Sequence, residues 1–374
     1  MNRNAIASIR LINQRIARPH LKSVKDTVAW MGAMQAQDYA MAKWAIGVRT
    51  PNSTNDAVET AIDRGEILRT HLLRPTWHII SADDFSWLLE LTSPGIKASL
   101  TSRHKQLGLS EAVISKSEAI IEKALRGGKH KTRKELIAEL GEAGIATDEN
   151  RASHLFLRAE LDGILCSGAT KGGGWTYALC AGRVPKAKSL TREEALAALG
   201  ERYFSSRGPA TLRDFIWWSG LAAADAKRAL GMVKPQMCSE TIDSLTYWFA
   251  DSQSGHSTGR ATERTAEQES VGLGCIHLLP AFDELLIGYS DRSASLPFEH
   301  RRKSVSNNGI FRPIVVEGGQ VKGTWKRTFK GDKVLVEIEL FERPQKNATG
   351  ALERASERFG RFVDRKVELK LEFS

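Results

Sequence analysis

Cysteine is scarce in this sequence, and its spacing argues against a metal site. The chain of 374 residues has four cysteines, Cys166, Cys180, Cys238 and Cys275. No two of them form a C-x-x-C pair, and no histidine stands at a ligand spacing from them. We therefore expect no bound metal and four thiols in a reducing compartment, even for Cys166 and Cys180, which flank one glycine-rich segment.

Long hydrophobic runs are also missing. No stretch reaches the roughly 18 apolar residues that a membrane span requires, and residues 1–20 lack the continuous apolar core of a signal peptide. The G-x-x-x-x-G-K-[ST] order of a phosphate-binding P-loop is absent from the glycine-rich segment 168–174. The sequence therefore predicts a soluble, cytoplasmic protein with no membrane partner and no cofactor.

Positive charge, by contrast, is in excess. The 54 Lys and Arg residues outnumber the 44 Asp and Glu residues, which gives a net charge of +10 and a pI near 9.4. This excess favours a polyanionic partner, most often nucleic acid, although ordinary basic proteins share it. With 41% hydrophobic residues the chain can bury sizeable cores, and its length predicts about two to four domains.

Three helices followed by two short strands, the order of a winged helix-turn-helix unit, recur three times. Apolar residues at helical spacing mark the helices, and short apolar runs beside turns mark the strands. The helices are expected over residues 4–17, 22–35 and 55–65, then 110–126, 133–140 and 151–161, then 191–204, 211–219 and 221–230. The strand pairs are expected over residues 67–70 and 76–80, 164–167 and 175–179, and 237–242 and 244–250.

The last third of the sequence has a different pattern. Residues 251–270 are polar and nearly free of large apolar side chains, which predicts a linker or mobile loop. Alternating apolar residues beyond them predict a small β-barrel or half-barrel. Its expected elements are strands over residues 311–317, 320–328 and 333–341, a helix over 348–362 and a strand over 367–373.

These patterns together predict an α+β protein with three tandem winged helix-turn-helix units and a C-terminal small β-barrel. A capping box, Thr132-x-x-Glu135, opens one helix of the second unit. Trp217 and Trp218 of the third unit are expected in its core. The predicted divisions are residues 1–105, 106–188, 189–250, the linker 251–270, and 271–374.

The segment Met34-Gln35-Ala36-Gln37-Asp38 closes an apolar run and contains two amides two residues apart. On a helix, residues at this spacing point about 200° away from each other, so Gln35 and Gln37 cannot act together in helical backbone. We therefore expect a helix end there, where the chain opens and both side chains can hold one water molecule. The alternative is a solvated helix end without chemistry.

Five blocks in one order resemble the bacterial winged-helix DNA glycosylases: residues 34–38, 69–78, 207–211, 279–284 and 308–313. The resemblance implies winged helices and a β-barrel around a channel wide enough for DNA. It also implies double-stranded DNA as the partner and excision of N7-alkylated purines, including those in interstrand crosslinks. The catalytic motif of this family is Gln-Φ-Gln in one branch and Gln-Φ-Asp in the other, where Φ is an aliphatic residue. Gln35 and Gln37 match the first branch, with Ala36 at Φ.

Two amides are sufficient for this chemistry because an N7-alkylated purine is already cationic and leaves without being protonated. The remaining task is to hold water beside C1′, and glutamine carbonyls can accept hydrogen bonds from that water. No lysine is marked as a nucleophile, so the enzyme is expected to be monofunctional. Asp38 is the rival group for the water. Asp283 and Glu284 are weaker rivals, which we expect to pair with local arginines or to cap backbone instead.

Basic residues at several places are candidate DNA contacts. His71 and Arg74, in or near the first wing, are assigned to the lesion strand, with His71 also a less favoured general base. Phosphate contacts are expected from five residues of the C-terminal part, which add salt dependence without sequence preference. They are Arg301, Arg302, Lys322, Lys326 and Arg327.

Two other functions share the same sequence features. The first is a winged-helix transcription regulator, which usually has one or two such units and dimerises on a palindromic site. Three units in one chain favour a monomer that clamps DNA. The second is a member without activity that is retained as a DNA-binding scaffold.

Overall fold

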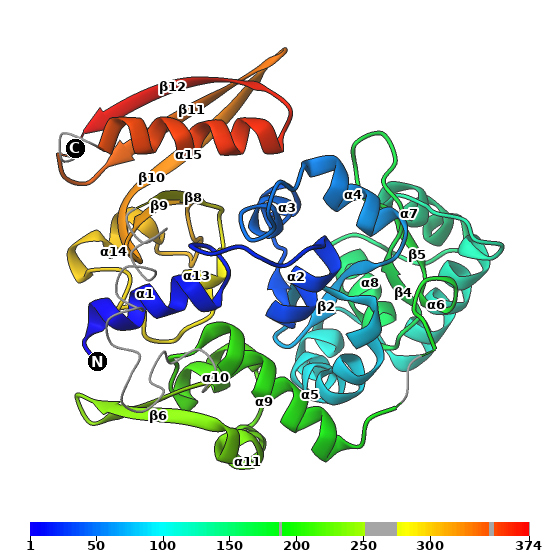
Figure 1. Cartoon of the computed structure of the whole chain (residues 1–374). Helices are drawn as coiled ribbons and strands as arrows, with labels where there is room; N and C mark the ends of the chain where they lie inside the picture. Colours follow the sequence, from blue (N-terminus) through cyan, green and yellow to red (C-terminus); the bar gives the residue numbers. More distant parts are fainter. Residues whose placement is uncertain (187–188, 251–274, 344–347, 374) are drawn as a thin grey trace. The chain divides into compact units, whose positions relative to one another are not determined.

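The computed structural model describes residues 1–186, 189–250, 275–343 and 348–373 (Figure 1). The chain divides into two compact units, neither of which is continuous in sequence. The motif unit, named for the segment 34–38, comprises residues 1–58, 196–218 and 222–374, and the middle unit comprises residues 59–195 and 219–221. The predicted linker 251–270 lies outside the described residues. The domain boundaries predicted from the sequence, at residues 105, 188 and 250, remain predictions.

The middle unit contains helices and two antiparallel hairpins. Its elements are α4 (Asn55–Asp63, which begins in the motif unit), β2 (Ile67–Leu72), β3 (Thr76–Ser81), α5 (Phe85–Gln106), α6 (Glu111–Leu125), α7 (Arg133–Glu142), α8 (Arg151–Leu161), β4 (Leu165–Ser167) and β5 (Tyr177–Leu179). β2 pairs with β3, and β4 pairs with β5. The predicted capping box opens α7, where the side chains of Thr132 and Glu135 each accept the other's backbone N–H. The sequence did not predict α5.

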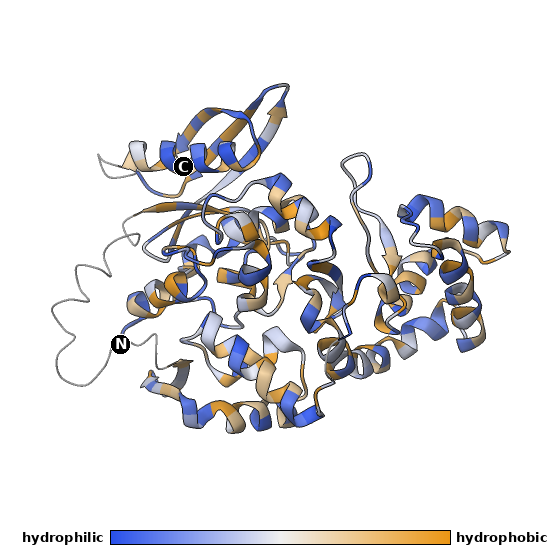
Figure 2. Ribbon diagram, turned by 45° about the vertical axis from the view of Figure 1, so that its right-hand side comes forward, coloured by the Kyte–Doolittle hydropathy of each residue, from blue (hydrophilic) through white to orange (hydrophobic). Residues whose placement is uncertain are grey.

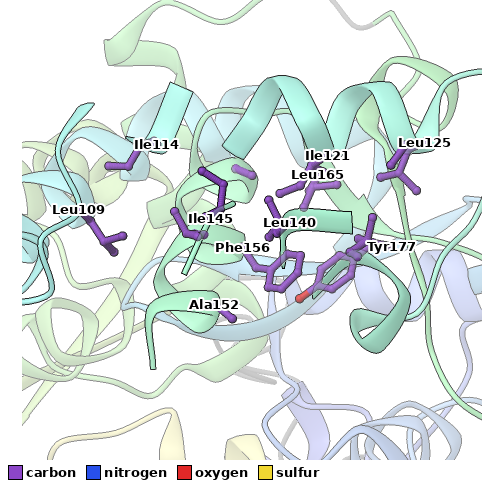
Figure 3. Packing of buried hydrophobic residues seen from close by; sticks show 14 of the residues in the cluster. Leu109, Ile114, Ile121, Leu125, Leu140, Ile145, Ala152, Phe156, Leu165 and Tyr177 are labelled. Carbon is purple, nitrogen blue, oxygen red and sulfur yellow. The ribbon is translucent and has the colours of Figure 1, made fainter. Parts of the chain in front are cut away.

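The core of the middle unit lies among α6, α7, α8 and the β4–β5 hairpin (Figure 3). Ile121 of α6 and Leu140 of α7 are fully buried in it. Phe156 of α8 stacks on Tyr177 of β5, with ring centroids 5.0 Å apart. Burial of this apolar surface is the main favourable term in the stability of the unit.

All four cysteines are free thiols, as the sequence predicts. Cys166 and Cys180 are buried in and beside the β4–β5 hairpin. Burial, reinforced by the hydrogen bond with Cys166, raises the pKa of the Cys180 thiol well above its usual range. Both groups therefore behave as small core residues.

The motif unit begins with four short elements and continues, after the middle unit, with three helices and a hairpin. These elements are α1 (Arg3–Asn13), α2 (Val24–Met31), β1 (Met34–Gln35), α3 (Tyr39–Gly47), α9 (Arg192–Arg207), α10 (Leu212–Ser219), α11 (Ala223–Val233), β6 (Met237–Ile242) and β7 (Leu245–Ala250). The order of three helices and a hairpin at α9 to β7 agrees with the predicted third copy. Helix α3 was not predicted.

The C-terminal part of the motif unit is built on one five-stranded sheet. Its elements are β8 (Ile276–Leu279), α13 (Glu284–Ile287), α14 (Arg301–Ser304), β9 (Ile314–Glu317), β10 (Gln320–Lys330), β11 (Lys333–Leu340), α15 (Ala348–Phe362) and β12 (Lys366–Phe373). The strand order is β12-β11-β10-β9-β8. β12 runs parallel to β11, with α15 between them in sequence (Figure 1), and the other pairs are antiparallel.

The predicted β-barrel is wrong for the part of the chain that the structure describes, although the mixed α+β class is confirmed. The two edge strands, β8 and β12, are not paired with each other, so the sheet is open. α15 packs beside this sheet instead, where Phe359 meets Trp325 of β10 at a centroid distance of 5.0 Å. Because α15 covers one face of the sheet, the sheet buries its apolar side chains without closing into a barrel.

Of the two tryptophans that the sequence predicts in the core of the third unit, one is buried. Trp218 is 1% exposed, as predicted, but Trp217 is 41% exposed, which makes that prediction wrong. Trp217 Nε1 donates to the Ile287 carbonyl at 3.1 Å, and the Arg292 guanidinium lies 5.3 Å from the ring centroid. Adjacent residues on a helix point in directions about 100° apart, so both could not face one core.

Hydrophobic and hydrophilic residues alternate along the helices (Figure 2). Among the described residues, no helix has both the length and the apolar content needed to cross a membrane. Helices such as α1 and α15 are amphipathic and bury one side.

Candidate active site around the Gln-Ala-Gln segment

The segment that contains both glutamines is a short non-helical link between two helices. Helix α2 ends at Met31, because Gly32 has φ of 70° and turns the chain out of the helix. Met34 and Gln35 are extended as β1, and helix α3 starts at Tyr39. The predicted helix over residues 22–35 is therefore too long at its C-terminal end.

The two glutamines lie in non-helical backbone, so the helical spacing that would point them apart does not apply. Gln35 ends the strand β1, Ala36 has no regular structure, and Gln37 lies in a bend. Gln35 is 6% exposed and Ala36 is fully buried, whereas Gln37 is exposed. The segment thus presents one nearly enclosed amide and one amide that solvent reaches.

Asp38, the rival of Gln37, has a structural contact. It is the N-cap of α3, and its Oδ1 accepts the Met41 N–H at 3.0 Å. Its carboxylate also acts on Arg327 of β10: burial lowers the pKa of this guanidinium, and the negative charge of Asp38 opposes that shift. Arg327 is the one predicted phosphate contact that the structure connects to the segment.

An ion pair from two distant parts of the chain lies against this segment. Arg207, at the end of α9, donates from Nε and Nη2 to Glu284 Oε2 at 3.0 and 2.7 Å. Trp218 Nε1 donates to the same oxygen at 3.2 Å, and the guanidinium lies 4.4 Å from the Trp218 ring centroid. The side chains of Arg207 and Glu284 are 0% and 2% exposed, so the pair is shielded from water.

The remaining hydrogen bonds of this pair go to the backbone that leads into the glutamines. Arg207 Nη1 donates to the Met31 carbonyl and Nη2 to the Ala33 carbonyl, both at 2.7 Å. Glu284 Oε1 accepts the Gln35 N–H at 2.8 Å. Three backbone groups at alternate residues are thus satisfied by one arginine and one glutamate.

A second buried ion pair lies beside the first in sequence. Arg49 forms a bidentate pair with Asp283, with both N–O distances 2.9 Å. Arg49 also donates to Gln14 Oε1 and to the Ala45 carbonyl, each at 2.9 Å. Asp283 caps α13 by accepting the Leu285 N–H at 2.9 Å. Asp283 and Glu284 thus pair with arginines and Asp283 caps backbone, as expected, but the arginines are not local: Arg49 and Arg207 are 234 and 77 residues away in sequence.

Most other predicted phosphate contacts are exposed on the motif unit. Arg301 and Arg302 form part of the short helix α14, and Lys322 and Lys326 lie on β10. Exposure of this kind suits contacts with a polyanion, but no contact in the structure assigns them to one.

His71 and Arg74 belong to the middle unit. His71 Nδ1 lies 2.7 Å from Glu160 Oε2, which also accepts the His71 backbone N–H at 2.8 Å, and Glu160 is fully buried. A buried carboxylate on Nδ1 fixes the orientation of the ring. Arg74 is half-buried in the turn between β2 and β3.

Sequence reasoning gave no role to three residues in these networks: Arg49, Arg207 and Glu160. Arg207 belongs to block 207–211, one of the five that resemble the glycosylase family, and this was its only signal in the sequence. Glu160 lies on a helix where a fully buried acid is unusual, and nothing in its neighbours in sequence indicates a partner. Within the described residues, no group of three or more His, Cys, Asp or Glu side chains is arranged as a metal site.

Comparison with known proteins assigns the chain to a family. The DNA glycosylase AlkZ-like family matches residues 28–362, and the chain therefore belongs to this family. It is similar to the interstrand DNA cross-link repair glycosylase of Streptomyces sahachiroi, with 24% identity over 325 residues, 81% of this chain and 82% of that protein. The solved structure of Streptomyces sahachiroi DNA glycosylase AlkZ has a TM-score of 0.73 at 19% identity and covers 98% of both chains. That likeness shows a shared fold.

Proposed function

We propose that this chain is a monofunctional DNA glycosylase that acts as a monomer on duplex DNA without a cofactor. It hydrolyses the N-glycosidic bond of N7-alkylated purines, including purines joined in interstrand crosslinks. The observation that carries the proposal is the non-helical Gln35-Ala36-Gln37 segment, with Gln37 exposed, in a member of a DNA glycosylase family.

The two amides bind water in the proposed reaction. The carbonyl oxygens of Gln35 and Gln37 accept hydrogen bonds from one water molecule and hold it beside C1′. The C1′–N9 bond breaks, and its electron pair neutralises the positive charge of the alkylated base. The water oxygen bonds to C1′ and its proton passes to solvent. Positioning of this kind contributes several kcal/mol to lowering a barrier.

Single-turnover release of 7-methylguanine from a defined duplex tests this function. The parent protein should release the base, and Gln35→Ala and Gln37→Ala should each slow release by about 100-fold or more without changing DNA affinity. Gln106→Ala, which removes an exposed glutamine at the end of α5, is the matched control and should release base at the parental rate.

Other outcomes distinguish the alternatives. Binding of duplex DNA without base release by the parent, from methylated or crosslinked substrate, would contradict the proposal and indicate a DNA-binding scaffold. Preference for one palindromic sequence over lesion-containing DNA would indicate a transcription regulator. Release that survives both glutamine substitutions would place the water elsewhere in the protein.

A further inference from the structure

We propose that Arg207 and Glu284 are positioning residues, which set the course of the backbone through residues 31–35 and thereby direct Gln35 and Gln37 toward the water. The inference rests on the proposed function, since it assigns a role in the reaction of that site. It concerns two side chains that touch neither substrate nor water and act through the backbone of the segment.

The hydrogen bonds lie along one edge of the segment. Arg207 binds the carbonyls of Met31 and Ala33, and Glu284 binds the N–H of Gln35. Met31 is the last residue of α2, Gly32 turns the chain out of the helix at φ 70°, and Gln35 belongs to β1, so this edge runs from the helix end into the strand. The ion pair binds the edge at three places and holds the change of direction between them.

The pair is rigid enough to fix that edge. A planar guanidinium and a carboxylate joined through two N–H groups have little freedom. Because Arg207 and Trp218 occupy Glu284 Oε2, the other oxygen, Oε1, is directed at Gln35. The orientation of the carboxylate thus fixes where the Gln35 amide nitrogen lies.

Stability alone does not explain an ion pair at this place. A buried pair can usually be replaced by apolar side chains of similar volume with little loss of stability, or with a gain. Apolar side chains could not bind the two carbonyls and the N–H that lead into the glutamines. The geometry of the segment is therefore the property that depends on Arg207 and Glu284.

The neighbouring pair offers an internal control. Arg49 is fully buried like Arg207 and binds the acid that precedes Glu284 in sequence. Its other partners are Ala45 and Gln14, neither of which belongs to the segment 31–38. Disturbing Arg49 should affect the stability of the same unit while leaving that segment in place.

The test compares Arg207→Lys with Arg49→Lys in the full chain. Lysine keeps the charge but cannot span two carbonyls and a carboxylate at once. We expect Arg207→Lys to slow single-turnover release of 7-methylguanine at saturating enzyme by about 100-fold, with DNA affinity within about threefold of the parent. Arg49→Lys should lower Tm by a similar amount and release base at the parental rate.

Amide hydrogen exchange reports on the segment independently of activity. Exchange at Gln35 should become faster in Arg207→Lys and stay slow in Arg49→Lys, because only the first substitution disturbs the group that accepts this N–H. If Arg207→Lys does not fold, the double variant Arg207→Met/Glu284→Leu takes its place. It leaves no unpaired buried charge, but the Met31 and Ala33 carbonyls, the Gln35 N–H and Trp218 Nε1 lose their partners. It should therefore fold with a lower Tm than the parent and release base slowly.

The outcomes separate this inference from the proposed function. A folded Arg207 variant that releases base at the parental rate, or equal slowing by Arg49→Lys, would overturn the positioning role while the glycosylase assignment stands. If the parent releases no base, and Arg207→Lys changes only the rate of amide exchange at Gln35, the proposed function is wrong. The positioning role in catalysis is then wrong as well.

Discussion

Asp38 follows the second glutamine, and its side chain already binds the backbone of the next helix. Oδ1 accepts the Met41 N–H at 3.0 Å, which satisfies one of the free donors in the first turn of α3. A capping role explains why an acid stands here without requiring it to activate water.

Substitution of Asp38 separates capping from catalysis. Asparagine caps helices about as well as aspartate, whereas alanine removes the cap and costs about 1 kcal/mol. We expect Asp38→Asn to keep the parental stability and to release base within about threefold of the parental rate. Asp38→Ala should lose about 1 kcal/mol in urea unfolding. If Asp38→Asn instead slows release by about 100-fold while remaining folded, the carboxylate is the base that activates water.

Two helices of the middle unit are joined by a pair of carboxyl groups. Glu118 of α6 lies close to Asp162, the C-cap residue of α8, which also binds Lys97 and Arg158. Burial, followed by the interaction with Asp162, raises the pKa of Glu118 from 4.5 to about 7, and Arg158 partly opposes the shift. The neighbouring carboxyl group thus favours a proton on Glu118.

This proton makes the contact between α6 and α8 sensitive to pH. Between pH 4.5 and about 7 the folded state holds a proton on Glu118 that the unfolded state has lost, so the free energy of unfolding falls as pH rises. After allowance for solvent screening, the loss between pH 5 and pH 8 should be about 1 kcal/mol.

Glu118→Gln should remove this component, because glutamine is uncharged at both pH values. Urea unfolding at pH 5 and pH 8 measures the difference. Glu122→Gln is the control: it lies on the same helix, and its pairing with Arg126 at 3.4 Å is exposed. It should retain the parental pH dependence. An identical change with pH in Glu118→Gln and the parent would contradict the assignment.

At the level of elements, the sequence predicted the parts whose signals are local. Hairpins and capped helices fall within this class, as Thr132 and Glu135 show at α7. Helix α3 was missed because apolar residues surround it, with Met41, Trp44 and Ile46 all buried, so no amphipathic period marks it. Helix α5 was missed because it contains Pro94, a residue that usually ends helices.

The predicted barrel failed for a different reason. Alternating apolar residues predict strands and the face that each one buries, but they do not determine whether the edge strands meet. β12 pairs parallel to β11 after the α15 crossover, which leaves it at the edge of an open sheet. That pairing depends on how α15 covers the sheet, which no local pattern encodes.

At the scale of the whole molecule, the site depends on contacts between distant parts of the sequence. Gln35 and Glu284 are 249 residues apart, and Arg207 and Met31 are 176 residues apart. The sequence indicated the two glutamines through their motif and predicted a local arginine or a backbone cap for Glu284. It did not indicate the distant Arg207, since that pairing depends on the fold that brings α9 and α13 to the segment.

The excess of positive charge is also a property of the whole molecule. We propose that Arg301 and Arg302 of α14 contribute to this excess and contact DNA phosphates. Each phosphate contact contributes about 0.9 to the slope of log K against log salt. The variant Arg301→Gln/Arg302→Gln should therefore reduce the slope by about 1.8 and weaken binding equally for different sequences.

The control removes the same amount of charge elsewhere on the motif unit. Lys333 and Lys370 pair with Glu368 and Glu372, each at 2.7 Å, so these ammonium groups already have anionic partners. Lys333→Gln/Lys370→Gln should leave the slope within error of the parent, because it releases no additional counterions from DNA. Fluorescence anisotropy across a salt series measures all three slopes. If both double variants reduce the slope equally, net charge determines the salt dependence, and α14 does not contact phosphate.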